Sequence, residues 1–154
     1  MTFRIDIPEG PTLELEHLVL DVNGTLTDRG QLIEGVRERL EQLRASLELH
    51  LLSGDTFGTL DEVAAELGLT PRRVTLGEEK AEIVGQLGAE RVVVIGNGRN
   101  DTPALEAAAL GVVIVGPEGA SAAAVRAADI LCRTAPEALD LLLDPRALGA
   151  TLRP

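Results

Sequence analysis

One aspartate, Asp21, stands where a buried strand is expected to end. The stretch LVLDVNGTLTD covers residues 18–28, and its apolar run from Leu18 to Leu20 favours a strand that Gly24 and the polar residues around it terminate. Open α/β sheets bind their ligands beyond the carboxyl ends of their strands. A carboxylate at such a position can serve as a nucleophile or as a ligand of a hard metal ion. Asp21 is therefore the first candidate for chemistry in this chain.

Three more segments carry polar residues at comparable places. Ser53 and Gly54 follow an apolar stretch, and the sequence GNGRND at 96–101 follows a β-branched run. Lys80, in the first turn of an expected helix, is the only lysine among 14 lysine and arginine residues. A compact ammonium and a planar guanidinium are not interchangeable, so we interpret this position as one that needs an ammonium. Parallel strands bring their carboxyl ends to one edge, where the four segments are expected to meet.

Each of these residues also has an ordinary structural explanation. Asp21 and Asn23 are typical turn formers, and Ser53 and Asp101 are typical helix N-caps. Lys80 could be a plain surface residue. Taken singly, these explanations are at least as good as the functional ones. All four segments in this order, at one edge of one sheet, favour a functional site.

The alternation of strands and helices predicts the elements that position these residues. It indicates one domain over residues 1–154, a three-layer doubly wound α/β fold with a parallel sheet between helices. Residues 3–16 are expected to form an N-terminal edge hairpin, residues 27–33 a small flap turning at Arg29-Gly30, and residues 144–154 a tail that wraps or frays. Strands are predicted at 17–21, 47–52, 73–76, 91–95, 112–115 and 129–132, and helices at 34–46, 58–67, 78–87, 102–109, 119–128 and 135–143.

The composition limits the partners. A net charge of −11 disfavours phosphate backbones and anionic membranes, and 1% aromatic residues leaves little for base stacking. No apolar stretch of about 18 residues and no signal-peptide core is found. The single cysteine, Cys132, excludes an internal disulfide, so a cytoplasmic protein is expected. His17 and His50, near the opposite edge of the expected sheet, are interpreted as structural.

The four segments, taken in order, resemble the motifs of the haloacid dehalogenase superfamily over roughly residues 17–132. Asp21 in DVNGT resembles the nucleophile of the DxDGT motif, and Ser53 resembles the motif II residue that hydrogen-bonds a phosphoryl oxygen. Lys80 resembles the motif III lysine, and Asp101 in GNGRNDTPAL resembles an acid of motif IV, usually GDGxND. LLSGD and GNGRNDTPAL are especially similar to the phosphorylation domain of P-type cation ATPases, and the chain most resembles the small soluble P-type-ATPase-like group.

This resemblance implies a Rossmann-like fold without a cap domain and a Mg²⁺-dependent phosphatase or phosphotransferase that forms an aspartyl phosphate. The implied substrate is a phosphorylated small molecule or a phosphoprotein, and a homo-oligomer is one way to close the uncapped site. The implied catalytic residues are Asp21, Asn23, Ser53 and Lys80. The implied phosphate-binding residues are Asn23, Gly24, Ser53, Gly54 and Lys80, and the implied Mg²⁺ ligands are Asp21, Asn23, Asn97 and Asp101.

Two positions depart from the superfamily pattern. Asn23 stands where DxDGT has its second aspartate, and a neutral amide cannot shuttle a proton. Asn97 stands at the usual first aspartate of motif IV, which removes one negative charge from the metal site. Three hypotheses therefore stay open: a slow Mg²⁺-dependent phosphatase or phosphotransferase, a protein that accepts phosphate on Asp21 and holds it as a switch, and a non-catalytic binding module.

Overall fold

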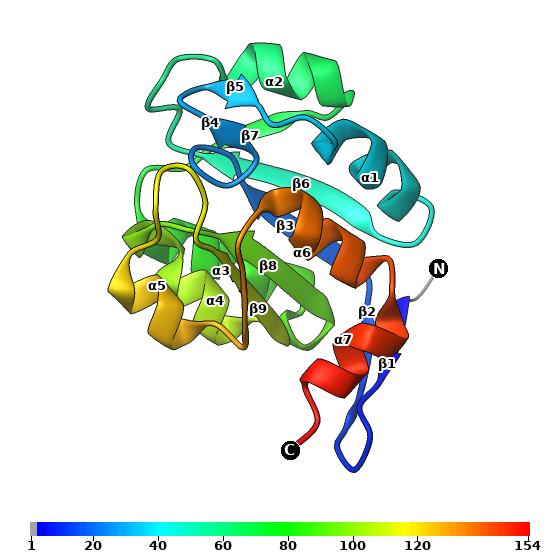
Figure 1. Ribbon diagram of the computed structural model, residues 1–154. Coiled ribbons are helices and arrows are strands. Elements are labelled where there is room, and N and C mark those ends of the chain that lie inside the picture. The colour runs from blue at the N-terminus through cyan, green and yellow to red at the C-terminus, as the bar shows by residue number, and fades with distance from the viewer. Residues whose placement is uncertain (1–2) are drawn as a thin grey trace.

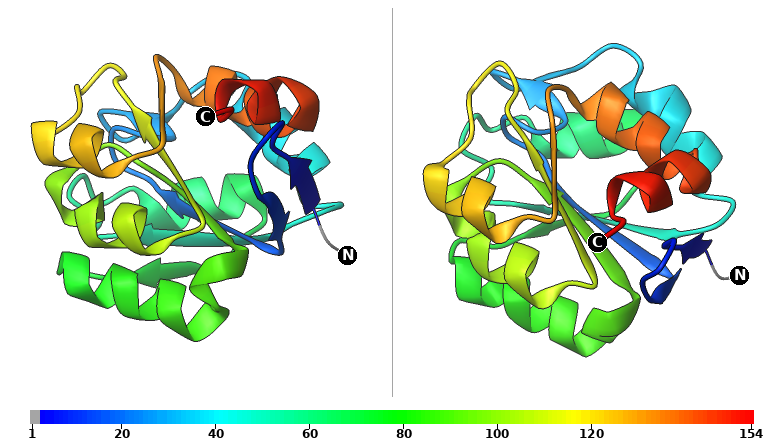
Figure 2. Two further views of the ribbon diagram at one scale, coloured as in Figure 1. Left: turned by 90° about the horizontal axis from the view of Figure 1, so that it is seen from below. Right: turned by 60° about the horizontal axis from the view of Figure 1, so that its bottom comes forward.

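A six-stranded sheet lies between two layers of helices in the computed structural model, which describes residues 3–154 (Figure 1, Figure 2). The strand order is β10-β9-β8-β3-β6-β7, and every neighbouring pair is parallel. The predicted three-layer parallel α/β architecture is therefore confirmed. The strands are β3 (His17–Asp21), β6 (Glu48–Ser53), β7 (Pro71–Arg73), β8 (Val92–Gly96), β9 (Leu110–Ile114) and β10 (Ile130–Cys132).

Apolar side chains of the sheet point alternately into two separate cores. In β3, Leu18 and Leu20 belong to one core and Val19 to the other, as the two-residue period of a strand requires. The first core is covered by α1 (Val36–Leu43), α2 (Leu60–Leu67), α6 (Ala135–Leu142) and α7 (Pro145–Thr151). The second core is covered by α3 (Gly77–Leu87), α4 (Thr102–Ala107) and α5 (Ala122–Ala127).

The chain order places the predicted site at the centre of the sheet. β3 pairs with β6 on one side and with β8 on the other, so the strand order reverses at β3. Ligands of open α/β sheets bind where the order reverses, beyond the carboxyl ends of the strands. The loops that follow β3, β6 and β8 are thus neighbours at this switch point.

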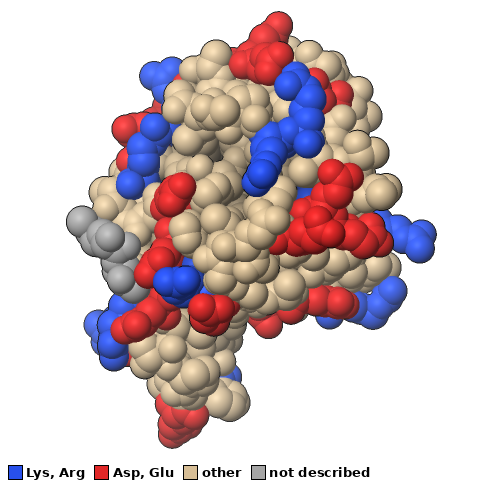
Figure 3. Space-filling model, turned by 180° about the vertical axis from the view of Figure 1, so that it is seen from behind, with Lys and Arg blue, Asp and Glu red and all other residues tan. Residues whose placement is uncertain are grey.

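The predicted N-terminal hairpin is present, but it does not form an edge of the main sheet. β1 (Phe3–Asp6) and β2 (Thr12–Leu15) pair only with each other, in a separate antiparallel sheet. Both sides of β3 are occupied by β6 and β8, so the hairpin has no strand to join there. It buries Ile5 and Leu15 in the first core instead. Its turn projects from the body of the protein, as Figures 1 and 3 show at the lower end of the molecule.

The prediction of a wrapping or frayed tail was wrong for most of that segment, because residues Pro145–Thr151 form α7. Asp144 Oδ1 accepts a hydrogen bond from the backbone N of Ala147 at 3.2 Å, and Pro145 occupies the start of the helix. Leu148 is buried in the first core. Gly149 allows α7 to touch β1, since a Cβ there would lie 2.6 Å from the carbonyl oxygen of Asp6.

Two smaller predictions can be compared directly. The edge strand β7 begins at Pro71, two residues before the predicted 73–76, and an edge position tolerates the missing proline N–H. The predicted flap is confirmed as β4 (Thr27–Asp28) and β5 (Gln31–Leu32), an antiparallel pair. Between β3 and β6 the described chain holds only this flap and α1, so no cap domain is inserted there.

The surface carries charges of both signs. On the face of the described residues that Figure 3 shows, acidic and basic side chains are interspersed, and no broad basic surface is visible. Within residues 3–154, no helix combines the length and the apolar character needed to span a bilayer.

Candidate active site

The ammonium of Lys80 lies between two carboxylates at the carboxyl edge of the sheet. Its Nζ donates to Asp21 Oδ1 at 2.9 Å and to Asp101 Oδ1 at 2.7 Å. Asp21 ends β3, Asp101 belongs to the short 3-10 turn η2 (Arg99–Asp101) after β8, and Lys80 lies in the first turn of α3. All three side chains are buried, and only 2% of Lys80 is exposed. Lys80 is therefore not a surface residue, and the three segments converge as predicted.

Asp101 also fixes the loop that follows β8. Its Oδ2 accepts hydrogen bonds from the backbone N of Asn97 at 3.0 Å and of Gly98 at 2.9 Å. Gly96 makes room for this carboxylate, because a Cβ there would lie 2.5 Å from Cγ of Asp101. Both oxygens of Asp101 thus have protein donors. Asp101 anchors Lys80 and the loop, and its side chain makes no N-cap hydrogen bond to α4.

Thr25, to which no role was assigned from the sequence, links Asp21 to Asn97. Its fully buried hydroxyl lies 2.9 Å from Asp21 Oδ2 and 3.1 Å from Asn97 Oδ1. Asn97 Nδ2 donates to the carbonyl oxygen of Gly119 at 3.0 Å, which turns Oδ1 toward the site. Gly24, with φ of 74°, passes close to this amide, and a Cβ there would lie 2.5 Å from Asn97 Nδ2. Two features of the sequence indicated this residue: its position in the loop just after Asp21, and its place as the last residue of DVNGT, the stretch that resembles DxDGT.

Asn23 and Ser53 face each other across the ends of β3 and β6. Asn23 Nδ2 lies 3.4 Å from Ser53 Oγ, a weak hydrogen bond, and Ser53 Oγ accepts a shorter one from the backbone N of Asp55 at 2.9 Å. Asp55 Oδ1 accepts from the backbone N of Leu60 at 3.0 Å, and its Oδ2 lies 3.3 Å from a guanidinium nitrogen of Arg73. Both oxygens of Asp55 are therefore held at the start of α2. Asn23 is the side chain that adjoins Ser53.

The protonation of the site follows from its burial. Burial and the charge of Asp101 raise the pKa of Asp21 from 3.8 to about 7, although Lys80 and Thr25 oppose the shift. Burial lowers the pKa of Lys80, but Asp21 and Asp101 together outweigh it and raise the pKa above the ordinary value. Lys80 is therefore an ammonium at neutral pH. Asp21 is therefore partly protonated near pH 7, and a cation beside it would favour the ionised carboxylate.

A family model described as haloacid dehalogenase-like hydrolase matches residues 6–109, about two thirds of the chain. The chain belongs to this family. The match includes Asp21, Ser53, Lys80 and Asp101, so the residues that meet in the structure lie within it.

The curated relatives of this haloacid dehalogenase-like protein include P-type ATPases. The manganese-exporting P-type ATPase of Mycobacterium leprae is 38% identical over 141 residues, which are 86% of this chain and 19% of the ATPase. The copper-exporting P-type ATPase of Staphylococcus aureus is 30% identical over 148 residues, which are 93% of this chain and 18% of the ATPase. The chain thus spans about a fifth of the length of these relatives.

Solved structures show the same two likenesses. The 3-deoxy-D-manno-octulosonate 8-phosphate phosphatase of Moraxella catarrhalis has a TM-score of 0.71 and 21% identity, with 85% of this chain and 87% of that chain covered. A zinc-transporting PIB-type ATPase has a TM-score of 0.65 and 26% identity, with 77% and 20% covered. The protein is therefore a small, capless haloacid dehalogenase-like domain that resembles the phosphorylation domain of P-type ATPases.

The oxygen atoms of the site suit a hard divalent cation. Asp21 Oδ2 and Asn97 Oδ1 both face the Thr25 hydroxyl, so these two oxygens converge. The carbonyl of Asn23 belongs to the same turn, and Mg²⁺ prefers such oxygen ligands and retains water. Asp101 Oδ1 accepts one hydrogen bond, from Lys80, and keeps a second lone pair, so Asp101 can hold Lys80 and the loop and still offer an oxygen to a cation. The M. catarrhalis phosphatase was solved with a magnesium ion and a phosphate ion.

The structure brings together most of the residues predicted to form the site. The contacts described above join five of them: Asp21, Gly24, Lys80, Asn97 and Asp101. Asn23 and Ser53 contact each other and lie beside this group, because Asp21 pairs with Leu52 in the sheet, and Gly54 follows Ser53. A second polar cluster was not predicted from the sequence. His17 and His50, interpreted separately as structural, meet at the amino-terminal end of β3 and β6, with 3.2 Å between ring nitrogens.

Proposed function

We propose that this haloacid dehalogenase-like protein is a Mg²⁺-dependent phosphatase or phosphotransferase that acts slowly through an aspartyl phosphate on Asp21. The observation that carries the proposal is the buried Lys80 ammonium, shared between Asp21 and Asp101 beside Ser53 and Asn23. A phosphate dianion and a carboxylate nucleophile repel each other, and fixed positive charge removes that repulsion. The substrate would be a phosphorylated small molecule or a phosphoprotein.

Each residue has a defined part in this proposal. An oxygen of Asp21 attacks phosphorus, and the bond from phosphorus to the leaving oxygen breaks. Lys80 holds the nucleophile and offsets the charge of the phosphoryl group, while Ser53 and the backbone N–H groups of Gly24 and Gly54 would bind its oxygens. Mg²⁺ at Asp21, the Asn23 carbonyl and Asn97 would stabilise the charge that develops on the transferred group.

Asn23 accounts for the expected slowness. Departure of an alkoxide requires a proton, and attack of water on the aspartyl phosphate releases one. The Asn23 amide beside Ser53 neither supplies nor accepts that proton. Asp55, two residues after Ser53, is tied to Leu60 and Arg73.

The nucleophile is tested by steady-state hydrolysis of a phosphate ester at saturating Mg²⁺. Asp21→Asn should abolish turnover and labelling by a phosphoryl donor. Asp61→Asn makes the same chemical change at an exposed ion pair with Arg73 and should leave turnover unchanged. Full activity of Asp21→Asn would rule out Asp21 as the acceptor.

The missing acid is tested by Asn23→Asp. A positioned general base contributes about 10²–10⁴-fold in rate, so this nearly isosteric change should speed hydrolysis by a factor in that range. Asn100→Asp adds the same charge at an exposed position of the same edge and serves as the matched control. If Asn23→Asp is no faster than the wild type, the missing carboxylate does not limit the rate.

A phosphate-accepting switch is the second candidate, and the absence of a carboxylate at position 23 favours it. In that case Asp21 would still be phosphorylated, but the acyl phosphate would persist. Intact-protein mass spectrometry after exposure to acetyl phosphate would measure its lifetime. A stable adduct without ester turnover would favour the switch, and neither adduct nor turnover would favour a non-catalytic binding module.

A further inference from the structure

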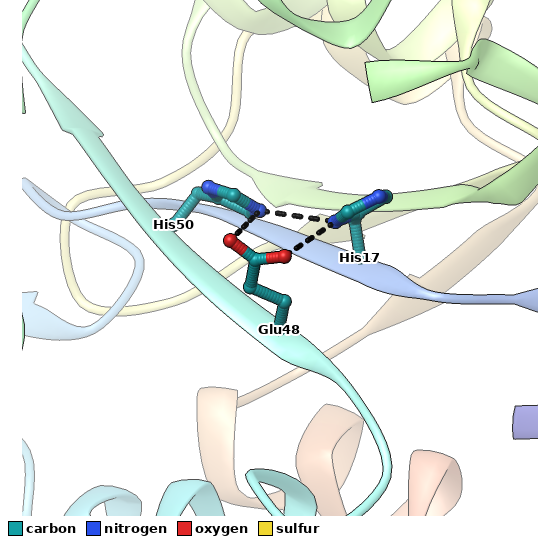
Figure 4. A group of neighbouring side chains, drawn as sticks. All are labelled: His17, Glu48 and His50. Atoms are coloured by element: carbon teal, nitrogen blue, oxygen red, sulfur yellow. Dashed lines mark hydrogen bonds and ion pairs between the residues drawn. The ribbon is translucent and has the colours of Figure 1, made fainter. Parts of the chain in front are cut away.

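Three potential metal ligands meet at the end of the sheet opposite to Asp21. They are His17 of β3 and Glu48 and His50 of β6, drawn in Figure 4. The parallel register pairs His17 with Glu48 and Val19 with His50. Alternate residues of a strand share a face, so all three side chains lie on one face of the sheet. The cluster is thus produced by the pairing of the two strands that also carry Asp21 and Ser53.

The two ring nitrogens have the spacing of ligands on one metal ion. His50 Nε2 and His17 Nδ1 lie 3.2 Å apart. Zn–N bonds of about 2.0–2.1 Å in a tetrahedral site separate two ligand nitrogens by about 3.3 Å. Glu48 oxygens lie 3.5 Å from His17 Nδ1 and 3.9 Å from His50 Nε2. One ligand atom from each residue can be chosen so that all lie within 4.8 Å of one another.

A direct hydrogen bond between the two rings also fits 3.2 Å, but it does not explain Glu48. The carboxylate distances to the ring nitrogens are too long for good hydrogen bonds. The Glu48 side chain is 68% exposed and has water available, yet its two oxygens face the same two nitrogens (Figure 4). A cation among the three groups would account for this arrangement.

We propose that His17, Glu48 and His50 bind a divalent transition-metal ion, with Zn²⁺ as the preferred occupant. Two imidazoles and one carboxylate suit zinc, while Mg²⁺ prefers oxygen ligands. The two imidazole side chains are 14% and 21% exposed, which leaves water access for a fourth ligand. The site is separate from the one at Asp21 and does not depend on the proposed phosphatase activity.

The surroundings of the cluster support metal binding. A carboxylate oxygen of Glu16 lies 4.0 Å from His17 Nε2, the ring nitrogen that points away from the cluster, and Arg91 holds Glu16 at 3.4 Å. At 4.0 Å this carboxylate makes no hydrogen bond to His17, but its negative charge beside the cluster favours a bound cation.

The test uses the full chain after removal of metal with EDTA and dialysis. The chain contains only two histidines, so NMR of ¹³C-labelled imidazoles reports on this cluster alone. Addition of one equivalent of Zn²⁺ should shift the resonances of both rings, and calorimetry should give one site. His17→Gln, His50→Gln and the exposed change Glu48→Gln should each weaken Zn²⁺ binding by at least about tenfold.

Two control variants separate this site from other acidic groups. Glu62→Gln makes the same change as Glu48→Gln at an exposed position of α2 and should leave Zn²⁺ binding unchanged. Asp21→Asn removes the ligand of the other proposed site and should also leave it unchanged. Zn²⁺ binding that leaves both imidazole resonances in place, that survives Glu48→Gln, or that is lost in Asp21→Asn would overturn the proposal.

Discussion

Replacement of Lys80 by methionine tests whether this ammonium neutralises the site. The variant keeps the length of the side chain and leaves Asp21 and Asp101 buried without the charge that lies 2.9 and 2.7 Å from them. Breaking a buried ion pair by removing one partner costs about 3–5 kcal/mol of unfolding free energy. Because Lys80 serves two carboxylates, we expect Lys80→Met to cost about 4–5 kcal/mol above pH 8 in the absence of metal.

The cost should depend on pH, because a buried carboxylate can take up a proton instead. The pKa of Asp21 is about 7 in the wild type, and loss of the ammonium raises it further. The folded variant then binds a proton over a wider pH range than the folded wild type, so its deficit shrinks as pH falls. The deficit should therefore be smaller at pH 6 than at pH 9, by up to about 1.4 kcal/mol for each pH unit by which the pKa of Asp21 rises in the variant.

Urea unfolding with EDTA at pH 6 and pH 9 measures both quantities. Arg39→Met is the control, since it breaks the exposed pair of Arg39 with Asp140 and should cost no more than about 1 kcal/mol at either pH. In the double variant Lys80→Met, Asp101→Asn, removal of one carboxylate should recover part of the loss. A cost for Lys80→Met that is no larger than for Arg39→Met, or that is the same at both pH values, would refute the reasoning.

Three further outcomes are expected from the same geometry. In EDTA, the contribution of Asp21 to the free energy of unfolding should be greatest below about pH 4 and decline as pH rises to about 7, because the folded protein holds a proton that the unfolded chain releases. Urea titrations that give a higher free energy of unfolding at pH 8 than at pH 5 would contradict the raised pKa. Gly96→Ala should destabilise the protein by about 1–3 kcal/mol and weaken Mg²⁺ binding, because the new Cβ would displace Asp101. Gly85→Ala should have neither effect, because nothing lies within 4 Å of the Cβ that it adds. Equal effects of the two changes on thermal unfolding would argue against the close approach of Gly96 and Asp101. Asn97→Asp should tighten Mg²⁺ binding measured by calorimetry, since it adds a charge at an oxygen that faces Asp21 through Thr25, and unchanged affinity would exclude position 97 as a ligand.

The sequence located the site because the site lies in loops that directly follow strands. Asp21 and Ser53 each end an apolar run, and Lys80 was singled out as the one lysine of the chain and by its place between the other motifs. What the sequence did not reveal was how the groups divide their contacts. Asp101 was predicted as a metal ligand, and in the structure it also accepts hydrogen bonds from Lys80 and two backbone amides, which the sequence did not indicate. That division depends on the conformation of the loop after β8, which the order of residues does not specify.

Contacts between segments far apart in the chain were the other part that was missed. The hairpin was expected at a sheet edge, because alternation predicts strands but not the strand that each one joins. The cluster of His17, Glu48 and His50 arises from the β3–β6 register, and a shift by one residue would place the side chains on opposite faces. α7 was not predicted, although Asp144-Pro145 is a typical helix start.

The burial of Lys80 leaves this protein without a lysine amine on its surface. Reagents and enzymes that modify lysine side chains, by acylation, crosslinking or attachment of another protein, need an accessible ε-amine, and the only one in the chain is 2% exposed. In the native state such chemistry has no side-chain target unless the site opens. The rate at which Lys80 is acylated therefore measures how often the site at the carboxyl edge of the sheet opens, and no substitution is needed to introduce a reactive group.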